Sequence, residues 1–354
     1  MKIIAAPDSF KDCLSAPQVA DAIASALEEQ LACGRLPAGT EILRFPVADG
    51  GEGTAALLTE ALGGQTVPCE VSGPLGTPVE ARYGVAGSTA IIEIAEACGL
   101  QLLRPEERDP LRTTTRGVGQ LLLDARRNGC DKFLVCLGGS ATCDGGAGML
   151  EVPGLDEAMR GAQVTLLCDV DNPFLGPDGA AQVFAPQKGA SPADVAILEA
   201  RMQAMASRLA RETGTDVSGL PGAGAAGGLG GAFMACFQAK RQSGIDAVLD
   251  ALQFDKALEG AALVITGEGR SDRQTLAGKA ACGVLRRSGD VPVALLAGRI
   301  DDPAALRSAG FSMLVEVSPR DLPLSAALLP GVATSNIRSA VARLCEAFLT
   351  LRAR

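Results

Sequence analysis

The chain has 354 residues, which suffices for one large domain or two ordinary ones, either with a sizeable hydrophobic core. Its formal net charge is -9 at pH 7 and it has no run of Lys and Arg, so nucleic acids and anionic membranes are unfavourable partners. Histidine is absent, which excludes Ser-His-Asp and Cys-His catalysis and leaves Asp, Glu, Lys and the single tyrosine as proton acceptors.

The eleven cysteines are scattered without a Cys-x-x-Cys pair, and several lie inside apolar runs. This distribution favours reduced, buried thiols over a disulfide framework or a zinc site. No apolar stretch approaches the roughly 20 residues of a membrane-spanning helix, and the N-terminal apolar run is too short for a signal peptide. We therefore expect a cytoplasmic protein.

The first elements alternate between strands and helices. An apolar run at residues 2–6 predicts a strand, and the capping-box pattern at Ser15 predicts the start of a helix. A second strand at 42–47 and a helix at 55–62 follow. The order strand, helix, strand, helix is typical of a parallel sheet covered by helices.

A different style of strand begins near residue 70. Three short segments bounded by turns follow one another without helices between them, which indicates an antiparallel or mixed sheet; they cover 67–71, 80–85 and 90–94. Later apolar runs predict strands at 133–137, 164–170, 262–266, 292–297 and 312–317. The main helices among them are expected at 117–128, 191–209, 231–240, 278–287 and 335–351.

The most informative loop follows the predicted strand at 133–137. Two glycines and Ser140 come directly after this strand, with Thr142 and Asp144 close behind. Glycine at a strand end lets backbone N–H groups approach an anion, and the hydroxyls could donate to phosphate oxygens. The Asp144 carboxylate could hold Mg²⁺. Taken alone, the segment is equally well explained as a glycine-rich turn.

The same pattern of strand, glycine, carboxylate and hydroxyl occurs twice more, after the strands at 42–47 and 262–266. Asp49 and Glu52, separated by two glycines, form a common arrangement for reaching one Mg²⁺, although turn formation also explains them. Three strand ends of this kind predict one composite site. Asp169 and Asp171 also lie two residues apart on an extended segment, so their side chains project to the same face.

A glycine-dense segment precedes the predicted helix at 231–240. Gly222, Gly224 and Gly227 match the dinucleotide-binding spacing, but no strand precedes them, so a Rossmann cofactor site is unfavourable. A glycine-rich loop before a helix could still hold a phosphate. Four cations lie in or beside glycine- or serine-bearing loops, although solvation at the surface is the usual state of such residues: Lys11, Lys188, Arg270 and Lys279.

Ten short motifs match one family's pattern in order along nearly the whole chain, at residues 6–11, 47–54, 73–76, 109–115, 138–142, 168–173, 184–189, 221–228, 265–270 and 278–279. With them the chain resembles the bacterial glycerate kinase family, the class that typically produces 2-phosphoglycerate. Three features depart from that pattern. Cys143 replaces the usual asparagine, Asp12 and Cys13 replace a pair of small residues, and the segment at 151–163 is shortened.

The resemblance implies an α/β protein of two domains, a parallel Rossmann-like domain and a mixed α/β middle domain, with the active site in the cleft. We expect the parallel domain at residues 1–70 and 290–354, and the middle domain, with much of the ligand site, at 71–289. The implied ligands are ATP, Mg²⁺ and the small-molecule substrate D-glycerate, and the sequence is compatible with a homo-oligomer.

Roles for individual residues follow from the same resemblance. Asp8 and Asp169 are the candidates for the base, and Lys11 and Arg270 would neutralise the substrate carboxylate or the γ-phosphate. Asp49, Glu52 or Asp144 would carry Mg²⁺. Substrate and nucleotide would contact Ser9, Gly50, Gly51, Thr54, Gly138, Gly139, Ser140, Thr142, Asn172, Gly222, Gly224, Gly227, Gly267, Glu268, Gly269 and Lys279.

Two alternatives stay open from the sequence. One is a kinase for another small hydroxy acid, and the other is a catalytically weakened protein that binds a nucleotide or metabolite, suggested by Cys143 and the shortened segment. The sequence does not fix which hydroxyl is phosphorylated.

Overall fold

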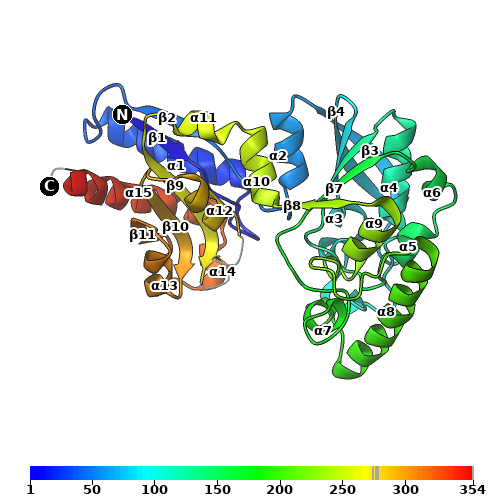
Figure 1. Cartoon of the computed structure of the whole chain (residues 1–354). Coiled ribbons are helices and arrows are strands. Elements are labelled where there is room, and N and C mark those ends of the chain that lie inside the picture. Colours follow the sequence, from blue (N-terminus) through cyan, green and yellow to red (C-terminus); the bar gives the residue numbers. More distant parts are fainter. Residues whose placement is uncertain (273–274, 276–278, 353–354) are drawn as a thin grey trace. The chain divides into compact units, whose positions relative to one another are not determined.

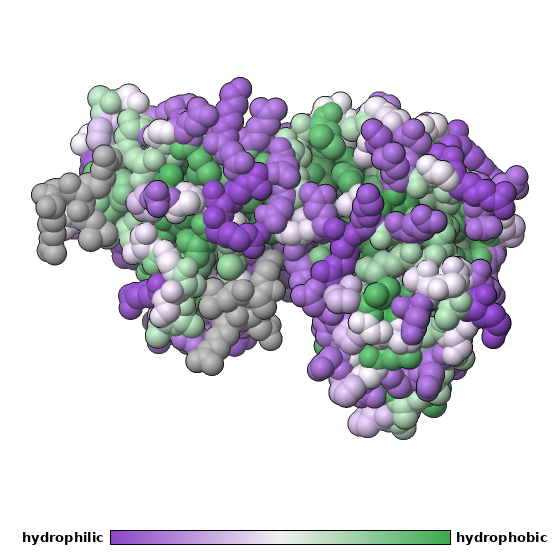
Figure 2. All heavy atoms as spheres, viewed as in Figure 1, coloured by the Kyte–Doolittle hydropathy of each residue, from purple (hydrophilic) through white to green (hydrophobic). Residues whose placement is uncertain are grey.

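The computed structural model describes residues 1–272, 275 and 279–352. The chain forms two compact units, one made of Met1–Asp49 with Ile245–Arg354 and the other of Gly50–Gly244. The first contains both chain ends, in blue and in orange to red, and the second is the middle of the chain, in cyan to green (Figure 1). Hydrophilic residues cover much of the visible face of each unit (Figure 2), as expected for a chain with a net charge of -9.

The first unit is built on a five-stranded sheet in the order β11-β10-β9-β1-β2, in which every pair is parallel. Its strands are β1 (Lys2–Ala5), β2 (Glu41–Arg44), β9 (Ala261–Ser271), β10 (Val293–Ile300) and β11 (Met313–Glu316). Its helices are α1 (Ala16–Ala32), α10 (Gly244–Ala251), α11 (Phe254–Leu258), α12 (Ala280–Arg287), α13 (Pro303–Ser308), α14 (Leu324–Ala327) and α15 (Pro330–Arg352).

Helix α1 begins as the sequence predicts. The Gln18 N–H points to Ser15 Oγ at 3.5 Å, and the Ser15 N–H donates to Gln18 Oε1 at 2.9 Å, so both groups of the capping box are satisfied. The apolar face of α1 packs with α15 and the sheet, where Ile23, Leu27 and Ile337 are fully buried. This core fixes the carboxyl ends of β1, β9 and β2, from which the chemically important loops depart.

The second unit contains a six-stranded mixed sheet in the order β3-β4-β5-β6-β7-β8. Strands β3, β4 and β5 pair antiparallel, and β5 to β8 pair parallel. The strands are β3 (Gln65–Ser72), β4 (Pro78–Ala86), β5 (Thr89–Glu93), β6 (Lys132–Cys136), β7 (Gln163–Leu167) and β8 (Lys240–Gln242). The expected combination of a parallel sheet and a mixed sheet in an α/β protein is confirmed.

The helices of the second unit vary in length. The α-helices are α2 (Thr54–Ala61), α3 (Ala95–Cys98), α4 (Arg116–Arg127), α5 (Ala147–Leu150), α6 (Leu155–Ala158), α7 (Ala180–Phe184), α8 (Pro192–Thr213) and α9 (Leu229–Phe237). Three short 3-10 helices are η1 (Leu100–Leu102), η2 (Pro105–Glu107) and η3 (Pro186–Lys188). Within the described residues, no helix combines the length and the apolar character that crossing a membrane requires.

Some element and unit boundaries differ from those expected. Residues 50–70 belong to the second unit because α2 packs on β4 and β5, and residues 245–289 belong to the first because β9 pairs with β1 and β10. Strand β7 ends at Leu167 and not at 170. The expected start of a helix at 278 lies outside the described residues.

The shortened segment at 151–163 still forms a packed connection. Helix α6 lies within it, and its Leu155 is buried together with Met159 and with the apolar side of α4. The short connection therefore contributes to the core of the second unit.

Candidate active site

Three carboxylates follow neighbouring parallel strands of the first unit. Asp8 follows β1, Asp49 follows β2, and Glu268 lies near the end of β9. Because β2, β1 and β9 are adjacent and parallel, their carboxyl ends lie at one edge of the sheet. The Asp8 N–H also donates to the Gly267 carbonyl at 2.9 Å, which ties this loop to β9.

Electrostatics at this edge act mainly on Asp8. Burial raises the pKa of its carboxyl to about 7, and the nearby Asp49 and Glu268 carboxylates contribute in the same direction. The Ser9 N–H, which donates to Asp8 Oδ1 at 2.6 Å, and the Lys11 ammonium oppose this increase. The predicted residues Asp8, Ser9, Lys11 and Asp49 therefore belong to one electrostatic cluster.

Glu268 is anchored more firmly than Asp8. Its buried carboxylate accepts hydrogen bonds from Ser271 Oγ at 2.9 Å and from Thr275 Oγ1 at 2.7 Å. Lys279 Nζ, predicted to bind a ligand, lies 3.2 Å from the other carboxylate oxygen. Glu268 and Lys279 thus form an ion pair at the end of β9.

Arg270 lies farther along β9 and is 71% exposed. Its Nε donates to Asp301 Oδ2 at 2.6 Å, so the guanidinium makes an exposed ion pair at the end of β10. The preceding glycines allow close strand packing. A Cβ on Gly267 would lie 2.3 Å from the Leu296 carbonyl oxygen, whereas a Cβ on Gly269 would make only ordinary contacts.

In the second unit, the serine loop (residues 138–142) leaves β6 and approaches the loop that precedes α2. The Gly138 N–H donates to the Gly50 carbonyl at 3.1 Å, and a Cβ on Gly138 would lie 2.5 Å from Gly51 Cα. Thr54 Oγ1 in turn accepts a hydrogen bond from the Gly50 N–H at 3.1 Å. These predicted site residues therefore hold two loops together, while Gly139 is exposed and Glu52 faces solvent.

A buried lysine lies beneath the serine loop. Lys188 is 2% exposed, and its ammonium donates to Ser140 Oγ at 2.8 Å and to the Thr142 carbonyl at 2.6 Å. Thr142 is itself fully buried, so its side chain lies inside the unit. Sequence reasoning noted Lys188 without placing it in the site. Its position in the Pro-Gln-Lys-Gly turn, one of the motifs that match the family pattern, was the available signal.

Asp144 acts as an internal anchor. Its Oδ2 accepts from the Thr115 N–H and Thr115 Oγ1, both at 2.9 Å, and from the Gly148 N–H at 3.1 Å. Its Oδ1 accepts from the Gly146 N–H at 3.0 Å. The carboxylate therefore joins the starts of α4 and α5, and both of its oxygens are engaged within the protein.

The glycine-rich segment (residues 222–228) packs against two other loops. A Cβ on Gly227 would lie 2.0 Å from the Thr142 carbonyl oxygen, and one on Gly224 would lie 2.2 Å from the Pro173 carbonyl oxygen. The Gly224 N–H donates to the Asn172 carbonyl at 3.0 Å. Close approach of backbones inside the second unit explains these two glycines, and a Cβ on Gly222 would meet the Arg241 side chain.

Asp169 follows β7, and its Oδ2 accepts from the Gly244 N–H at 3.1 Å. Asn172 Nδ2 donates to the Asp178 carbonyl at 2.8 Å. Both predicted site residues therefore lie on the segment that follows the carboxyl end of a parallel strand.

Glu93 was not predicted from the sequence, although it ends β5 and thus occupies an informative position. It is buried, and its carboxylate accepts from the Gly53 and Ala55 N–H groups at the start of α2, at 3.1 and 3.3 Å. Burial raises the pKa of Glu93 to about 7 against the effect of these two donors.

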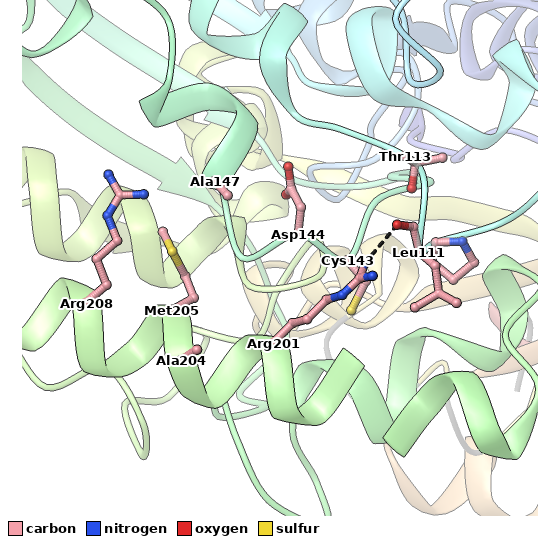
Figure 3. A pocket seen from close by; sticks show the side chains of 10 residues that line it. Leu111, Thr113, Cys143, Asp144, Ala147, Arg201, Ala204, Met205 and Arg208 are labelled. Atoms are coloured by element: carbon pink, nitrogen blue, oxygen red, sulfur yellow. Dashed lines mark hydrogen bonds between the residues drawn. The ribbon is translucent and has the colours of Figure 1, made fainter. Parts of the chain in front are cut away.

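A pocket of about 380 Å³ lies between α8, the loop before α4 and the residues that follow the serine loop (Figure 3). Arg201 and Arg208 project from α8, and the Arg201 Nη1 donates to the Leu111 carbonyl at 2.8 Å. Cys143 also lines the pocket, and burial raises the pKa of its thiol to about 11. The cysteine is therefore a neutral, packed side chain at neutral pH.

The predicted residues thus form a carboxylate cluster in the first unit and a lysine-supported loop in the second. That the ends of strands from both units share one pocket stays a prediction. Among the described residues, no group of three acidic or thiol side chains is arranged to hold a metal ion.

Comparison with known proteins identifies the family. The model of the glycerate kinase family matches residues 3–156 and 150–349. The chain is 41% identical over 357 residues to the glycerate kinase of Bacillus subtilis (strain 168), with 92% of each chain covered. It is 38% identical over 358 residues to the glycerate 2-kinase of Escherichia coli (strain K12), with 91% of this chain and 92% of the relative covered.

A solved structure gives the same result. The crystal structure of a protein from Salmonella typhimurium LT2, whose description names glycerate kinase 2, has a TM-score of 0.83 and 37% sequence identity. The match covers 100% of both chains. The likeness therefore extends over the complete sequence and both sheets, and the chain belongs to the glycerate kinase family.

Proposed function

We propose that this protein is a glycerate kinase that transfers the γ-phosphoryl group of ATP to D-glycerate and produces 2-phosphoglycerate. The observation that carries the proposal is sequence identity of about 40% to glycerate kinases over more than nine-tenths of the chain. The name of the relative from Escherichia coli, glycerate 2-kinase, supports the 2-phosphate as product.

In the proposed reaction, a hydroxyl oxygen of glycerate forms a bond to the γ-phosphorus while the bond from that phosphorus to the bridging oxygen of ADP breaks. The hydroxyl proton passes to a protein carboxylate, and ADP leaves. Positioning and charge neutralisation supply most of the rate increase in phosphoryl transfer, so the protein needs no covalent intermediate.

We assign Asp8 as the carboxylate that accepts the proton. Its pKa of about 7 lies near neutral pH, where a general base is most effective. Asp169 is the alternative, since it also follows the carboxyl end of a parallel strand. Lys11, exposed beside Asp8, and Arg270 on β9 are assigned to the negative charges of the substrate carboxylate and the γ-phosphate, where arginine offers a bidentate grip.

The candidate ligands of Mg²⁺ differ in how well they fit. Both oxygens of Asp144 accept hydrogen bonds from the protein, which disfavours Asp144 as a direct ligand. Asp49 fits better, because its charge adds to the repulsion at Asp8 that a cation would relieve. Mg²⁺ commonly binds one or two carboxylates with phosphate and water oxygens, and when bound with ATP it would neutralise phosphate charge.

The test is an assay of purified protein with ATP and D-glycerate, followed by ³¹P NMR of the product. We expect ADP and 2-phosphoglycerate in equal amounts, and no comparable turnover with lactate or other small hydroxy acids. ATP binding in a calorimeter without product formation would instead support a protein that only binds the nucleotide. Faster turnover of a different hydroxy acid would reassign the substrate.

A further inference from the structure

The proposed reaction gives no role to the buried ammonium of Lys188 in the second unit. Lys188 ends η3, and Gly189 follows it with φ of +100°. A Cβ on Gly189 would lie 2.3 Å from the Arg108 carbonyl oxygen, so the turn packs tightly against the chain at Arg108. This packing directs the lysine side chain inward, where 2% of the residue is exposed.

The charge of Lys188 is poorly compensated within the unit. Its ammonium donates to two neutral oxygens, Ser140 Oγ and the Thr142 carbonyl, and among the described residues it makes no ion pair with a carboxylate. A buried ammonium without a paired anion is costly, and burial accordingly lowers the pKa of Lys188. Asp144, the carboxylate that acts on the pKa of Lys188 together with the Cys143 and Cys98 thiols, has both oxygens occupied by other donors.

The directions of these two hydrogen bonds show which groups the Lys188 ammonium orients. An ammonium can only donate, so Ser140 Oγ must accept from Lys188. The hydroxyl proton of Ser140 therefore points away from the lysine and remains available as a donor. The second bond holds the backbone at Thr142 in place, so one side chain orients both a hydroxyl donor and the backbone of the serine loop.

We propose that Lys188 is a positioning residue for the phosphates of the nucleotide: it orients the Ser140 hydroxyl toward the triphosphate and supplies buried positive charge beneath the serine loop. The inference rests on the proposed function, in which ATP is the phosphoryl donor. It explains why an ammonium is retained in the interior with neutral acceptors, because the compensating anion arrives with the ligand.

The test compares Lys188→Met, Ser140→Ala and their combination with the wild type. We expect Lys188→Met to lower kcat/KM for ATP at least 10-fold and to change the KM for D-glycerate less than 2-fold. Ser140→Ala should act in the same direction. The double variant should be no worse than Lys188→Met within 2-fold, because the hydroxyl acts through its orientation by the lysine.

The matched control is Lys132→Met, which removes an exposed lysine at the start of β6 and should leave all kinetic constants unchanged. A kcat/KM for ATP within 2-fold of the wild type in Lys188→Met would overturn the proposal. Multiplicative losses in the double variant would also overturn it, since they indicate two independent roles.

Direct binding separates this inference from the proposed function and from a purely structural role. Lys188→Gln keeps a donor but removes the charge, and we expect it to weaken inhibition by tripolyphosphate and ATP binding at least 10-fold with little change in thermal midpoint. If wild-type protein binds ATP without phosphorylating D-glycerate, the proposed function fails while the ATP affinities still test Lys188. Wild-type protein that binds no ATP, or unchanged affinities in Lys188→Gln, would overturn the inference. If both Lys188 variants fail to fold, an unchanged tripolyphosphate inhibition constant in Ser140→Ala overturns it as well.

Discussion

The charged side chains that lie beside two of the glycine loops differ between the two units. In the first unit, Asp8, Asp49 and Glu268 gather at one edge of the sheet, and their mutual repulsion helps to raise the pKa of Asp8. In the second unit, the loop after β6 lies above a buried ammonium from Lys188 that has only neutral acceptors. The same arrangement of strand followed by glycine loop thus supports two different electrostatic environments.

The comparison shows that the glycine pattern alone does not state which ligand a strand end prefers. The carboxylate cluster is suited to accepting a proton, whereas the lysine-supported loop is suited to an anion. The following variants test each environment separately, in order of decreasing expected effect.

The largest effect is expected for Asp8→Asn. The amide has nearly the shape of the carboxyl but cannot accept the substrate proton, so we expect kcat to fall by about 10²–10⁴, the usual contribution of a general base. Steady-state phosphorylation of D-glycerate at pH 8 measures it. Asp21→Asn, which changes an exposed carboxylate on α1, is the control and should retain wild-type turnover.

Asp169→Asn decides between the two candidates for the base. If Asp8→Asn stays within 3-fold of wild-type turnover while Asp169→Asn loses at least 100-fold, the roles assigned above are reversed. Loss in both variants would indicate that one carboxylate accepts the proton and the other orients the substrate. The pH dependence of kcat in each variant then shows which carboxylate produces the acidic limb of the wild-type profile, because a general base is inactive once it is protonated.

The next effect is a loss of folding stability caused by crowding between residue 227 and the serine loop. Gly227→Ala places a Cβ 2.0 Å from the Thr142 carbonyl oxygen on a residue with φ of +67°. A left-handed conformation costs alanine about 1–2 kcal/mol and overpacking about 1–3 kcal/mol more, so we expect the free energy of unfolding to fall by about 3 kcal/mol. Urea-induced unfolding followed by circular dichroism measures this change.

Gly154→Ala provides the matched control for backbone strain. Gly154 has φ of +79°, but a Cβ there would meet no atom within 4 Å. We therefore expect a loss of about 1–2 kcal/mol, from conformation alone. Equal decreases in the free energy of unfolding of the two variants would show that the contact between residue 227 and the serine loop does not contribute to stability.

A smaller, pH-dependent effect is expected for Glu93→Gln. The pKa of Glu93 is raised in the folded state to about 7 from 4.5, so the folded protein holds this proton more tightly than the unfolded chain. The resulting stabilisation is present below about pH 4.5 and is lost as the pH rises to 7. Relative to wild type, Glu93→Gln should therefore gain about 2 kcal/mol between pH 5 and pH 8.

Unfolding in urea at pH 5, 6, 7 and 8 measures this difference. Glu80→Gln changes an exposed carboxylate on β4 and should follow the wild-type curve at every pH. Parallel curves for Glu93→Gln and wild type would mean that the Gly53 and Ala55 N–H groups offset the cost of burial.

The sequence predicts much of the fold because local patterns agree with the packing. The capping box at Ser15 and the change of strand style near residue 70 both correspond to features of the structure. The sequence predicts that the strand at 164–170 extends beyond the observed end of β7 at Leu167. The reason is that Cys168 and Val170 are apolar, although strand pairing has already ended. Hydrophobicity alone does not show where hydrogen bonding to a neighbouring strand stops.

The site was less predictable, because the function of a polar residue depends on contacts between distant segments. Asp144 was predicted to hold a metal, yet its neighbours supply four N–H and O–H donors, which no spacing in the sequence reveals. Lys188 also differs from expectation. Lysine side chains usually lie in solvent, whereas Lys188 is buried inside the second unit. Glycines also match ligand loops and tight backbone packing equally well, as Gly227 illustrates.

The smallest effect on stability is expected for Arg270→Ala, which sharpens the description of the carboxylate edge. The ion pair between Arg270 and Asp301 is exposed, so its loss should change the free energy of unfolding by less than about 0.5 kcal/mol. If the guanidinium instead binds the substrate carboxylate or the γ-phosphate, kcat/KM should fall at least 10-fold while stability stays constant. Arg160→Ala, which removes an exposed pair to Asp156 beside α6, is the control that should change neither quantity. Unchanged catalysis in Arg270→Ala would confine this arginine to its surface pair, and the positive charge at this edge would then come from Lys11 and Lys279.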